Sequence, residues 1–227
     1  MRRWADLAHD HLLADVSLWS ANLAQLKPDI EKIIPYADSF HIDVADSRFV
    51  PSLLFFPDLV AAIRPVTRLP FHIHLVVERP SQLLPDFCQA GGDFFSVHVE
   101  TGDAEVRDCF KLCRELERDV GLALRLETPI EAVRPYLDSV RSILLLGTEA
   151  GIKGAGLDPR ALARIRQVAD VLERYGRRQD VRIIADGAIR KNTVPSLRTA
   201  GTDVIVPGSL VFGASDLAST FGWIKAM

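Results

Sequence analysis

Ser39-Phe40-His41-Ile42-Asp43-Val44 is a short apolar run that carries one histidine and one aspartate close to its end. Its length and composition predict a buried β-strand. Because side chains two residues apart on a strand point to the same face, we expect His41 and Asp43 to lie side by side. The strand therefore presents an imidazole and a carboxylate on one side of a sheet.

Two further apolar runs end in the same kinds of side chain. Residues 70–76 carry His74 near their end, and residues 181–186 finish with Asp186. A single strand histidine is usually a core residue, and an aspartate after a strand is often a helix cap. The four residues at matching strand ends instead favour a site for Zn²⁺, Fe²⁺, Mn²⁺ or Co²⁺ with two built-in bases.

The remainder of the chain alternates short apolar runs with amphipathic runs. Strands are expected near residues 12–18, 39–44, 71–76, 93–99, 121–126, 142–146, 181–185 and 203–206. Helices are expected near residues 23–37, 58–63, 81–90, 104–118, 130–137, 159–175 and 193–200, with a last helix ending the chain. Eight such units predict an α/β fold, a single (β/α)8 TIM barrel over residues 1–227, with residues 1–13 as a short N-terminal extension. An open, doubly wound sheet is disfavoured because no glycine-rich turn follows the first strand.

In such a barrel the active site lies at the carboxyl ends of the strands, where the four candidate ligands are expected. His72 and His98 occupy similar strand positions, and each is interpreted as either a partner of the ligands or a core histidine. Trp4 and His9 precede the first strand, and we expect them to pack on the base of the barrel rather than on a neighbouring molecule.

Small residues after the last three strands point to a phosphate site. Short side chains let backbone N–H groups approach an anion, and the loops after the last strands of this fold often bind phosphate. Lys153 adds charge there or is only a solvated loop residue, and the sequence leaves both open. The candidate residues are Gly151, Lys153, Gly154, Gly187, Ala188, Gly208 and Ser209.

The overall composition excludes several classes of function. With 27 Lys and Arg against 30 Asp and Glu, and no basic run, nucleic acid is not an expected partner. No signal peptide and no apolar run long enough to span a bilayer is apparent, so no membrane association is expected. The three cysteines lie in helix-like segments and are interpreted as reduced, which predicts a cytoplasmic protein.

Several motifs together resemble the ribulose-phosphate 3-epimerase family. Residues 17–22, Ser-Leu-Trp-Ser-Ala-Asn, resemble the family's Ser-x-Leu-Ser-Ala-Asp segment. Residues 41–52, His-Ile-Asp-Val-Ala-Asp-Ser-Arg-Phe-Val-Pro-Ser, resemble its His-x-Asp-x-Met-Asp-Gly-x-Phe-Val-Pro-Asn signature. Residues 70–75, 96–100, 186–187 and 208–209 also match, so the resemblance runs from about Val16 to Gly213.

This resemblance implies a metal-dependent isomerase, an epimerase that inverts C3 of a phosphorylated keto-sugar. It implies one divalent metal held by His41, Asp43, His74 and Asp186. Asp43 and Asp186 would act as the two acid/base groups on opposite faces of the substrate, with an enediolate between the two proton transfers. Ser17 and His74 would contact the substrate. Family members often form dimers or hexamers, so a homo-oligomer is expected.

The chain departs from the family's pattern around the substrate rather than at the ligands. Residues 149–155 replace the family's Asn-Pro-Gly-Phe-Gly-Gly-Gln loop, Ala45 and Val76 replace two methionines, Ala188 replaces a glycine and Arg125 an asparagine. These departures leave the identity of the sugar open. The expected substrate is ribulose 5-phosphate or xylulose 5-phosphate, or a related ketose phosphate such as allulose 6-phosphate or a shorter one.

Two other classes of function fit the same barrel. One is a phosphosugar isomerase or aldolase, although no lysine stands at a strand end to form a Schiff base. The other is a non-catalytic barrel that binds a sugar phosphate. Complete retention of the four candidate ligands argues against the second class, because a binding module needs no paired bases.

Overall fold

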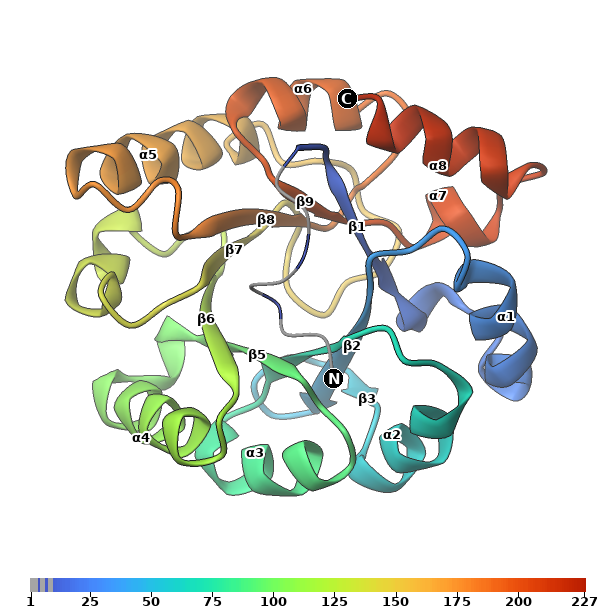
Figure 1. Cartoon of the computed structure of the whole chain (residues 1–227). Helices are drawn as coiled ribbons and strands as arrows, with labels where there is room; N and C mark the ends of the chain where they lie inside the picture. Colours follow the sequence, from blue (N-terminus) through green and yellow to red (C-terminus); the bar gives the residue numbers. More distant parts are fainter. Residues whose placement is uncertain (1–3, 5–6, 8–9) are drawn as a thin grey trace.

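The computed structural model describes residue 4, residue 7 and residues 10–227. Eight parallel strands form a closed barrel that helices surround, as the alternation along the chain predicts (Figure 1). The barrel strands are β1 (Leu13–Ser17), β2 (Ser39–Asp46), β4 (Phe71–Val76), β5 (Phe94–His98), β6 (Asp119–Leu124), β7 (Ser142–Leu146), β8 (Arg182–Asp186) and β9 (Val204–Val206). Because β1 pairs with both β2 and β9, the sheet closes on itself.

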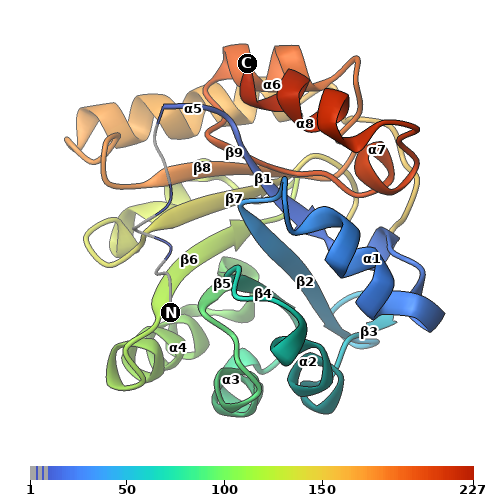
Figure 2. The same ribbon diagram turned by 45° about the vertical axis from the view of Figure 1, so that its right-hand side comes forward.

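The helices form the outer layer, and Figure 2 shows the same ring with α1, α7 and α8 turned forward. The α-helices are α1 (Leu26–Ile33), α2 (Pro57–Ile63), α3 (Pro80–Gln89), α4 (Asp103–Glu115), α5 (Ala161–Arg174), α6 (Val194–Ala200), α7 (Ser209–Phe212) and α8 (Leu217–Lys225). The 3-10 helices are η2 (Leu18–Ser20), η3 (Leu23–Gln25), η4 (Arg64–Val66), η5 (Val99–Thr101) and η6 (Ile130–Tyr136). In the described part of the chain, none of these helices combines the length and the apolarity needed to cross a bilayer.

Three elements differ from the expectations drawn from the sequence. The segment 130–137 forms the 3-10 helix η6 instead of an α-helix, and Pro135 inside it has no N–H for an α-helical bond. The expected helix 23–37 is split, because a short 3-10 turn capped by Asn22 precedes α1. A two-residue strand, β3 (Leu53–Leu54), pairs antiparallel to the end of β2 and was not expected.

Two separate apolar layers hold the barrel together. Alternate residues of β7 point to different layers. Leu144 belongs to the cluster inside the barrel, while Ile143 and Leu145 belong to the layer under the helices. This alternation follows from the two-residue period of a strand. The inner cluster comprises Trp4, Leu7, Leu13, Phe94, Ala123, Leu144, Leu146, Ile184, Val204 and Val206.

Trp4 closes the inner cluster at the base of the barrel. Its ring stacks on Phe94 with 4.3 Å between centroids, and only 1% of the residue is exposed. Leu7 is also buried, and its carbonyl oxygen accepts a hydrogen bond from Arg182. Trp4 therefore packs on the barrel base as expected, and Leu7 lies there as well, while His9 lies outside the described residues.

Candidate metal centre and active site

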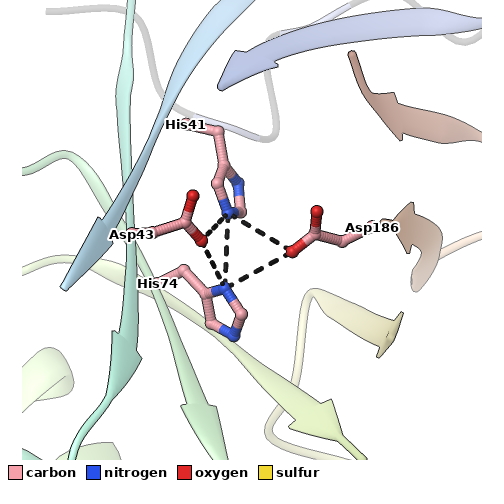
Figure 3. Close-up of side chains that lie close together, drawn as sticks. All are labelled: His41, Asp43, His74 and Asp186. Atoms are coloured by element: carbon pink, nitrogen blue, oxygen red, sulfur yellow. Dashed lines mark hydrogen bonds and ion pairs between the residues drawn. The ribbon is translucent and has the colours of Figure 1, made fainter. Parts of the chain in front are cut away.

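Four side chains from three strands converge at the carboxyl ends of the barrel strands (Figure 3). His41 and Asp43 come from β2, His74 from β4, and Asp186 from the last position of β8. The strand register explains part of the convergence, because Asp43 and His74 are partners across the β2–β4 ladder. The structure thus brings together the four residues that the sequence predicted as ligands.

The spacing of the four donor atoms fits a divalent cation. His41 Nε2 lies 3.1 Å from Asp43 Oδ1 and 3.3 Å from His74 Nδ1, and His74 Nδ1 lies 3.1 Å from Asp43 Oδ1. Asp186 Oδ2 lies 3.7 Å and 3.6 Å from the same two nitrogens. Four ligands at about 2.0–2.1 Å from a tetrahedral cation are themselves about 3.3–3.4 Å apart. Both the kinds of donor and their separations therefore suit such an ion.

The electrostatics of the cluster favour an added positive charge. Burial raises the pKa of Asp43, but the imidazoles of His41 and His74 together lower it by more, so this carboxyl stays ionised. Burial lowers the pKa of His41, yet Asp43 and Asp15 raise it well above its usual value. Burial raises the pKa of Asp186 to about 6, with Asp43 adding to the rise against the opposing effect of His41. A cation bound among these groups would supply the positive charge that the extra proton on His41 supplies when no cation is bound.

A second polar layer lies beneath the four residues, inside the barrel. Asp15 Oδ2 lies 3.0 Å from His41 Nδ1 and 2.6 Å from His72 Nδ1, while Ser39 donates a hydrogen bond of 2.6 Å to Asp15 Oδ1. His72 Nε2 lies 2.8 Å from the hydroxyl of Ser96, and burial lowers the pKa of His72 to about 4. All five side chains are fully or almost fully buried. His72 is thus a partner of the ligands rather than only a core histidine, which is one of the two interpretations expected from the sequence.

Asp15 was not predicted from the sequence, although a signal was present. It is the one charged residue of the five-residue buried strand β1, and it stands two positions before Ser17 on the same face. Ser17 itself donates a hydrogen bond of 3.2 Å to Asp43 Oδ2. A charged residue inside a buried strand implies buried partners, and here those partners are the histidines of β2 and β4.

His98 and Glu100 continue the network on the other side of the cluster. His98 Nε2 lies 3.0 Å from His74 Nε2, and His98 Nδ1 lies 2.9 Å from Glu100 Oε2. Glu100 also accepts hydrogen bonds from Thr128 and from the backbone N–H of Arg125. Burial raises the pKa of Glu100, but the contacts with His98, Thr128 and the backbone N–H of Arg125 together lower it by more, to about 2. His98 is therefore a partner of the cluster as well.

A cavity of about 230 Å³ opens above the cluster at the mouth of the barrel. Asp43, His74 and Asp186 form part of its floor, whereas His41 lies beneath and is fully buried. Ala45 and Val76 form part of an apolar wall beside the floor. All the other residues predicted to contact substrate line this same cavity: Ser17, Gly151, Lys153, Gly154, Gly187, Ala188, Gly208 and Ser209.

The loops after β8 and β9 bring unpaired amides to one end of the cavity. Within the described residues, the backbone N–H groups of Gly187, Ala188, Gly208 and Ser209 donate to no protein acceptor. Gly187 adopts φ +95°, and a Cβ there would lie 2.6 Å from Thr148 Oγ1, so a larger residue would not fit. A concave cluster of amides with no partner is suited to an anion.

The loop between β7 and α5 lies across the cavity mouth, drawn in yellow inside the ring in Figure 1. Lys153 on this loop donates a hydrogen bond of 2.8 Å to the carbonyl of Trp19, and the Gly151 carbonyl accepts one from Ser52. Arg190 donates to the carbonyls of Gly154 and Ala155. Lys153 thus bridges two loops at the edge of the cavity, while its side chain remains exposed. Arg190 and Trp19 also line the cavity and were not predicted.

Comparison with known proteins agrees with the motifs. The sequence model of the ribulose-phosphate 3 epimerase family matches residues 13–212. The ribulose-phosphate 3-epimerase of Bacillus subtilis is 34% identical over 210 residues, which cover 92% of this chain and 96% of that protein. The chloroplastic ribulose-5-phosphate-3-epimerase of Arabidopsis thaliana is 31% identical over 95% of this chain and 76% of that protein.

Solved structures support the fold. A 3-hexulose-6-phosphate synthase from Salmonella typhimurium aligns over 94% of this chain and 96% of its own, with a TM-score of 0.67 and 19% identity. A 3-keto-L-gulonate-6-phosphate decarboxylase from Vibrio cholerae aligns over 95% of this chain and 99% of its own, with a TM-score of 0.68 and 14% identity. At these identities the similarity establishes the barrel and nothing finer.

Proposed function

The chain belongs to the ribulose-phosphate 3-epimerase family and is thus an isomerase of ketose phosphates, and we propose that it inverts C3 with Asp43 and Asp186 as its two bases. The observation that carries this proposal is the placement of the two carboxylates. They come from β2 and β8, on opposite sides of the cluster, and both border the cavity (Figure 3). A substrate carbon held between them meets a proton acceptor on one face and a proton donor on the other.

The reaction requires one carboxylate to remove the C3 proton while the other returns a proton to the opposite face. Loss of the proton beside the C2 carbonyl leaves an enediolate, which is planar at C3 and can be protonated from either side. Ser17 donates to Asp43 and would hold that carboxylate in its orientation. Such positioned acid and base groups typically accelerate proton transfer by about 10²–10⁴-fold.

A divalent cation fits the same cluster, with His41, Asp43, His74 and Asp186 as its protein ligands. When bound, Zn²⁺, Fe²⁺, Mn²⁺ or Co²⁺ would stabilise the negative charge that develops on the substrate oxygens. This proposal is supported by the near-tetrahedral spacing of the donor atoms and by the buried negative charge around them.

The substrate phosphate is proposed to lie at the β8–β9 side of the cavity. The unpaired amides of Gly187, Ala188, Gly208 and Ser209 meet there, and a phosphate would satisfy them. Gly151, Lys153 and Gly154 would close over the sugar from the loop after β7. We propose that Lys153 contributes positive charge to the bound phosphate, since it lines the cavity and donates to the carbonyl of Trp19.

The apolar wall bears on the size of the sugar. Ala45 and Val76 stand where the family pattern has methionines, and both line the part of the wall nearest Asp43 and His74. Shorter side chains leave more room at the end of the cavity away from the proposed phosphate position. We therefore propose that the chain accepts a six-carbon ketose phosphate such as allulose 6-phosphate as well as ribulose 5-phosphate or xylulose 5-phosphate.

We further propose that residues 1–227 act as one domain in a cytoplasmic homo-oligomer. The three cysteines are free and buried, which suits a reducing compartment. Leu23, Leu53 and Phe56 are each more than half exposed, and they follow β1 and β2 near the barrel mouth. Contiguous exposed apolar patches mark contacts between proteins, and we propose that these three side chains lie at the subunit contact.

A screen of ketose phosphates in D₂O tests the function directly, with the metal content of the same sample measured. The expected result is deuterium at C3 of one or more substrates together with formation of the C3 epimer. Exchange at C1 or cleavage of the carbon chain would instead indicate an isomerase or an aldolase. Tight binding with no exchange, in protein that retains its metal, would indicate a binding protein.

The structure weighs against a Schiff-base aldolase. Lys153 is the only lysine among the described residues that line the cavity, and its Nζ points to the carbonyl of Trp19 at the rim. A Schiff base needs an amine beside the substrate carbonyl, near the floor. Trapping with borohydride on Lys153 would contradict this argument.

A further inference from the structure

Beneath the proposed ligands, the buried carboxylate of Asp15 contacts the far side of His41. We propose that Asp15 is a positioning residue that keeps the proton of His41 on Nδ1, so that Nε2 faces the cluster as an unprotonated ligand atom. This inference rests on the proposed metal centre. It assigns a role to a residue that does not itself reach the cavity, since Asp15 is fully buried and absent from the cavity lining.

The hydrogen bonds around Asp15 fix the direction of donation. An ionised carboxylate only accepts, so both His41 Nδ1, at 3.0 Å, and His72 Nδ1, at 2.6 Å, must donate to Oδ2. Ser39 donates to the other oxygen at 2.6 Å. With its proton on Nδ1, neutral His41 has a lone pair on Nε2, the atom that lies 3.1 Å from Asp43 Oδ1.

His72 gives the carboxylate its own support. Once His72 donates from Nδ1, its Nε2 accepts from the hydroxyl of Ser96 at 2.8 Å. Asp15 is therefore held by three donors from β2 and β4, and the carboxylate has little freedom to rotate away from His41. A carboxylate that orients a metal-binding histidine typically changes metal affinity by about 10–100-fold when it is removed.

A cation among Asp15, His41 and His72 is the competing interpretation, because these three could also form a ligand group. The separations argue against it. Asp15 Oδ2 lies 2.6 Å from His72 Nδ1, a hydrogen-bond length, whereas ligands of one cation are about 3.3–3.4 Å apart. The count of metal ions per chain separates the two interpretations.

Binding of Zn²⁺ to three proteins tests the proposal: the wild type, Asp15→Asn and the control Asp93→Asn. Asp93 is also a buried carboxylate with hydrogen-bond donors around it, but its partners are Arg64 and the backbone N–H of Phe71. We expect one Zn²⁺ per wild-type chain in competition with a chromophoric chelator. We expect a dissociation constant raised about 10–100-fold in Asp15→Asn and less than about twofold in Asp93→Asn.

The position of the proton is read from the zinc-loaded wild type, labelled with ¹⁵N in histidine. The expected NMR spectrum shows His41 protonated at Nδ1 and metal-bound at Nε2, which a purely structural role of Asp15 does not require. Metal on His41 Nδ1, two Zn²⁺ per chain, or equal affinity in the wild type and Asp15→Asn would each overturn the proposal. If Asp15→Asn does not fold, the wild-type spectrum still decides. A wild type that binds no Zn²⁺ would instead remove the proposed metal centre.

Discussion

The Nε2 atoms of His74 and His98 lie 3.0 Å apart, and the two rings stack with their centroids 5.1 Å apart. Because Nδ1 of His74 faces the cluster, its Nε2 is the nitrogen left to donate to His98. His98 in turn lies against Glu100 through its other nitrogen. The two histidines of the proposed centre are thus each linked to a carboxylate, His41 directly to the buried Asp15 and His74 through one intervening ring to the partly buried Glu100.

Glu100 is expected to make stability depend on acid pH. Its folded-state pKa of about 2 lies below the ordinary value of 4.5, so its contribution is fully present above about pH 4.5 and is lost as the pH falls towards 2. Glu100→Gln should lower the free energy of unfolding by about 2 kcal/mol at pH 6 and by much less near pH 2.5. Urea denaturation at both pH values measures this. The exposed Glu115→Gln is the control, and an equal loss at both pH values would contradict the assignment.

Replacement of either proposed base should abolish epimerisation. We expect Asp43→Asn and Asp186→Asn each to lose at least about 10²-fold in turnover, because each removes one of the two proton-transfer groups. Deuterium exchange measured from each epimer separately shows which carboxylate serves which face. Metal content is measured in parallel, since both residues are proposed ligands. Asp170→Asn, on the exposed side of α5, is the control, and full activity in either active-site variant would refute the two-base assignment.

The apolar wall should decide the size of the sugar. In the double variant Ala45→Met and Val76→Met, the longer side chains fill space beside Asp43 and His74. We expect kcat/KM for a six-carbon ketose phosphate to fall about tenfold more than for a five-carbon one, a difference of about 1.4 kcal/mol. Ala62→Met, on the exposed side of α2, controls for the substitution itself. An equal change for both sugars would show that this wall does not select for length.

Lys153 should affect substrate binding more than the chemical step. Its ammonium group donates to the carbonyl of Trp19 at the cavity rim, so Lys153→Met is expected to raise KM several-fold with kcat changed by less than about twofold. The wild-type KM should also rise with ionic strength, and more steeply than that of the variant. Steady-state kinetics at two salt concentrations provide the measurement, with Lys111→Met on α4 as the control. A variant with normal KM would make Lys153 a loop residue only.

Trp4 should stabilise the whole barrel although it stands at the start of the chain. Its ring is buried against Phe94 and His72 as part of the inner cluster. Trp4→Ala leaves a cavity at the barrel base, and we expect a loss of about 3–5 kcal/mol in the free energy of unfolding. Tyr175→Ala, which removes a half-exposed aromatic ring, is the control and should cost far less. Chemical denaturation of the two variants against the wild type tests the difference.

The alternation of apolar and amphipathic runs was enough to predict the barrel, because the strands are buried on both faces. The expected strands 71–76 and 142–146 coincide with β4 and β7, and the other six differ from the observed strands by one or two residues at an end. The 3-10 form of η6 was missed because a proline after an amphipathic start does not reveal which hydrogen bonds the turn will make. The strand β3 was missed because two residues are too few to show a period.

The four residues of the cluster were predictable because each stands at the end of a strand, and a barrel brings strand ends together. Asp15 and Arg190 were not predicted for different reasons. Asp15 stands inside a strand, where only the register with β2 shows that it reaches His41. Arg190 stands in a loop whose path depends on contacts with another loop, at Gly154 and Ala155. Strand register and loop paths depend on tertiary packing, so a local sequence pattern cannot predict them.

The closure of the barrel by β1 and β9 also has a consequence for synthesis on the ribosome. Leu13 pairs with Val204, about 190 residues later. At about 5–20 residues per second, the first strand waits roughly 10–40 s for this partner to be translated. During that interval one edge of β1 has no neighbouring strand, and the inner cluster that contains Trp4 lacks Val204 and Val206. Until β9 is made, this open edge of β1 is a site at which the nascent chain can mispair.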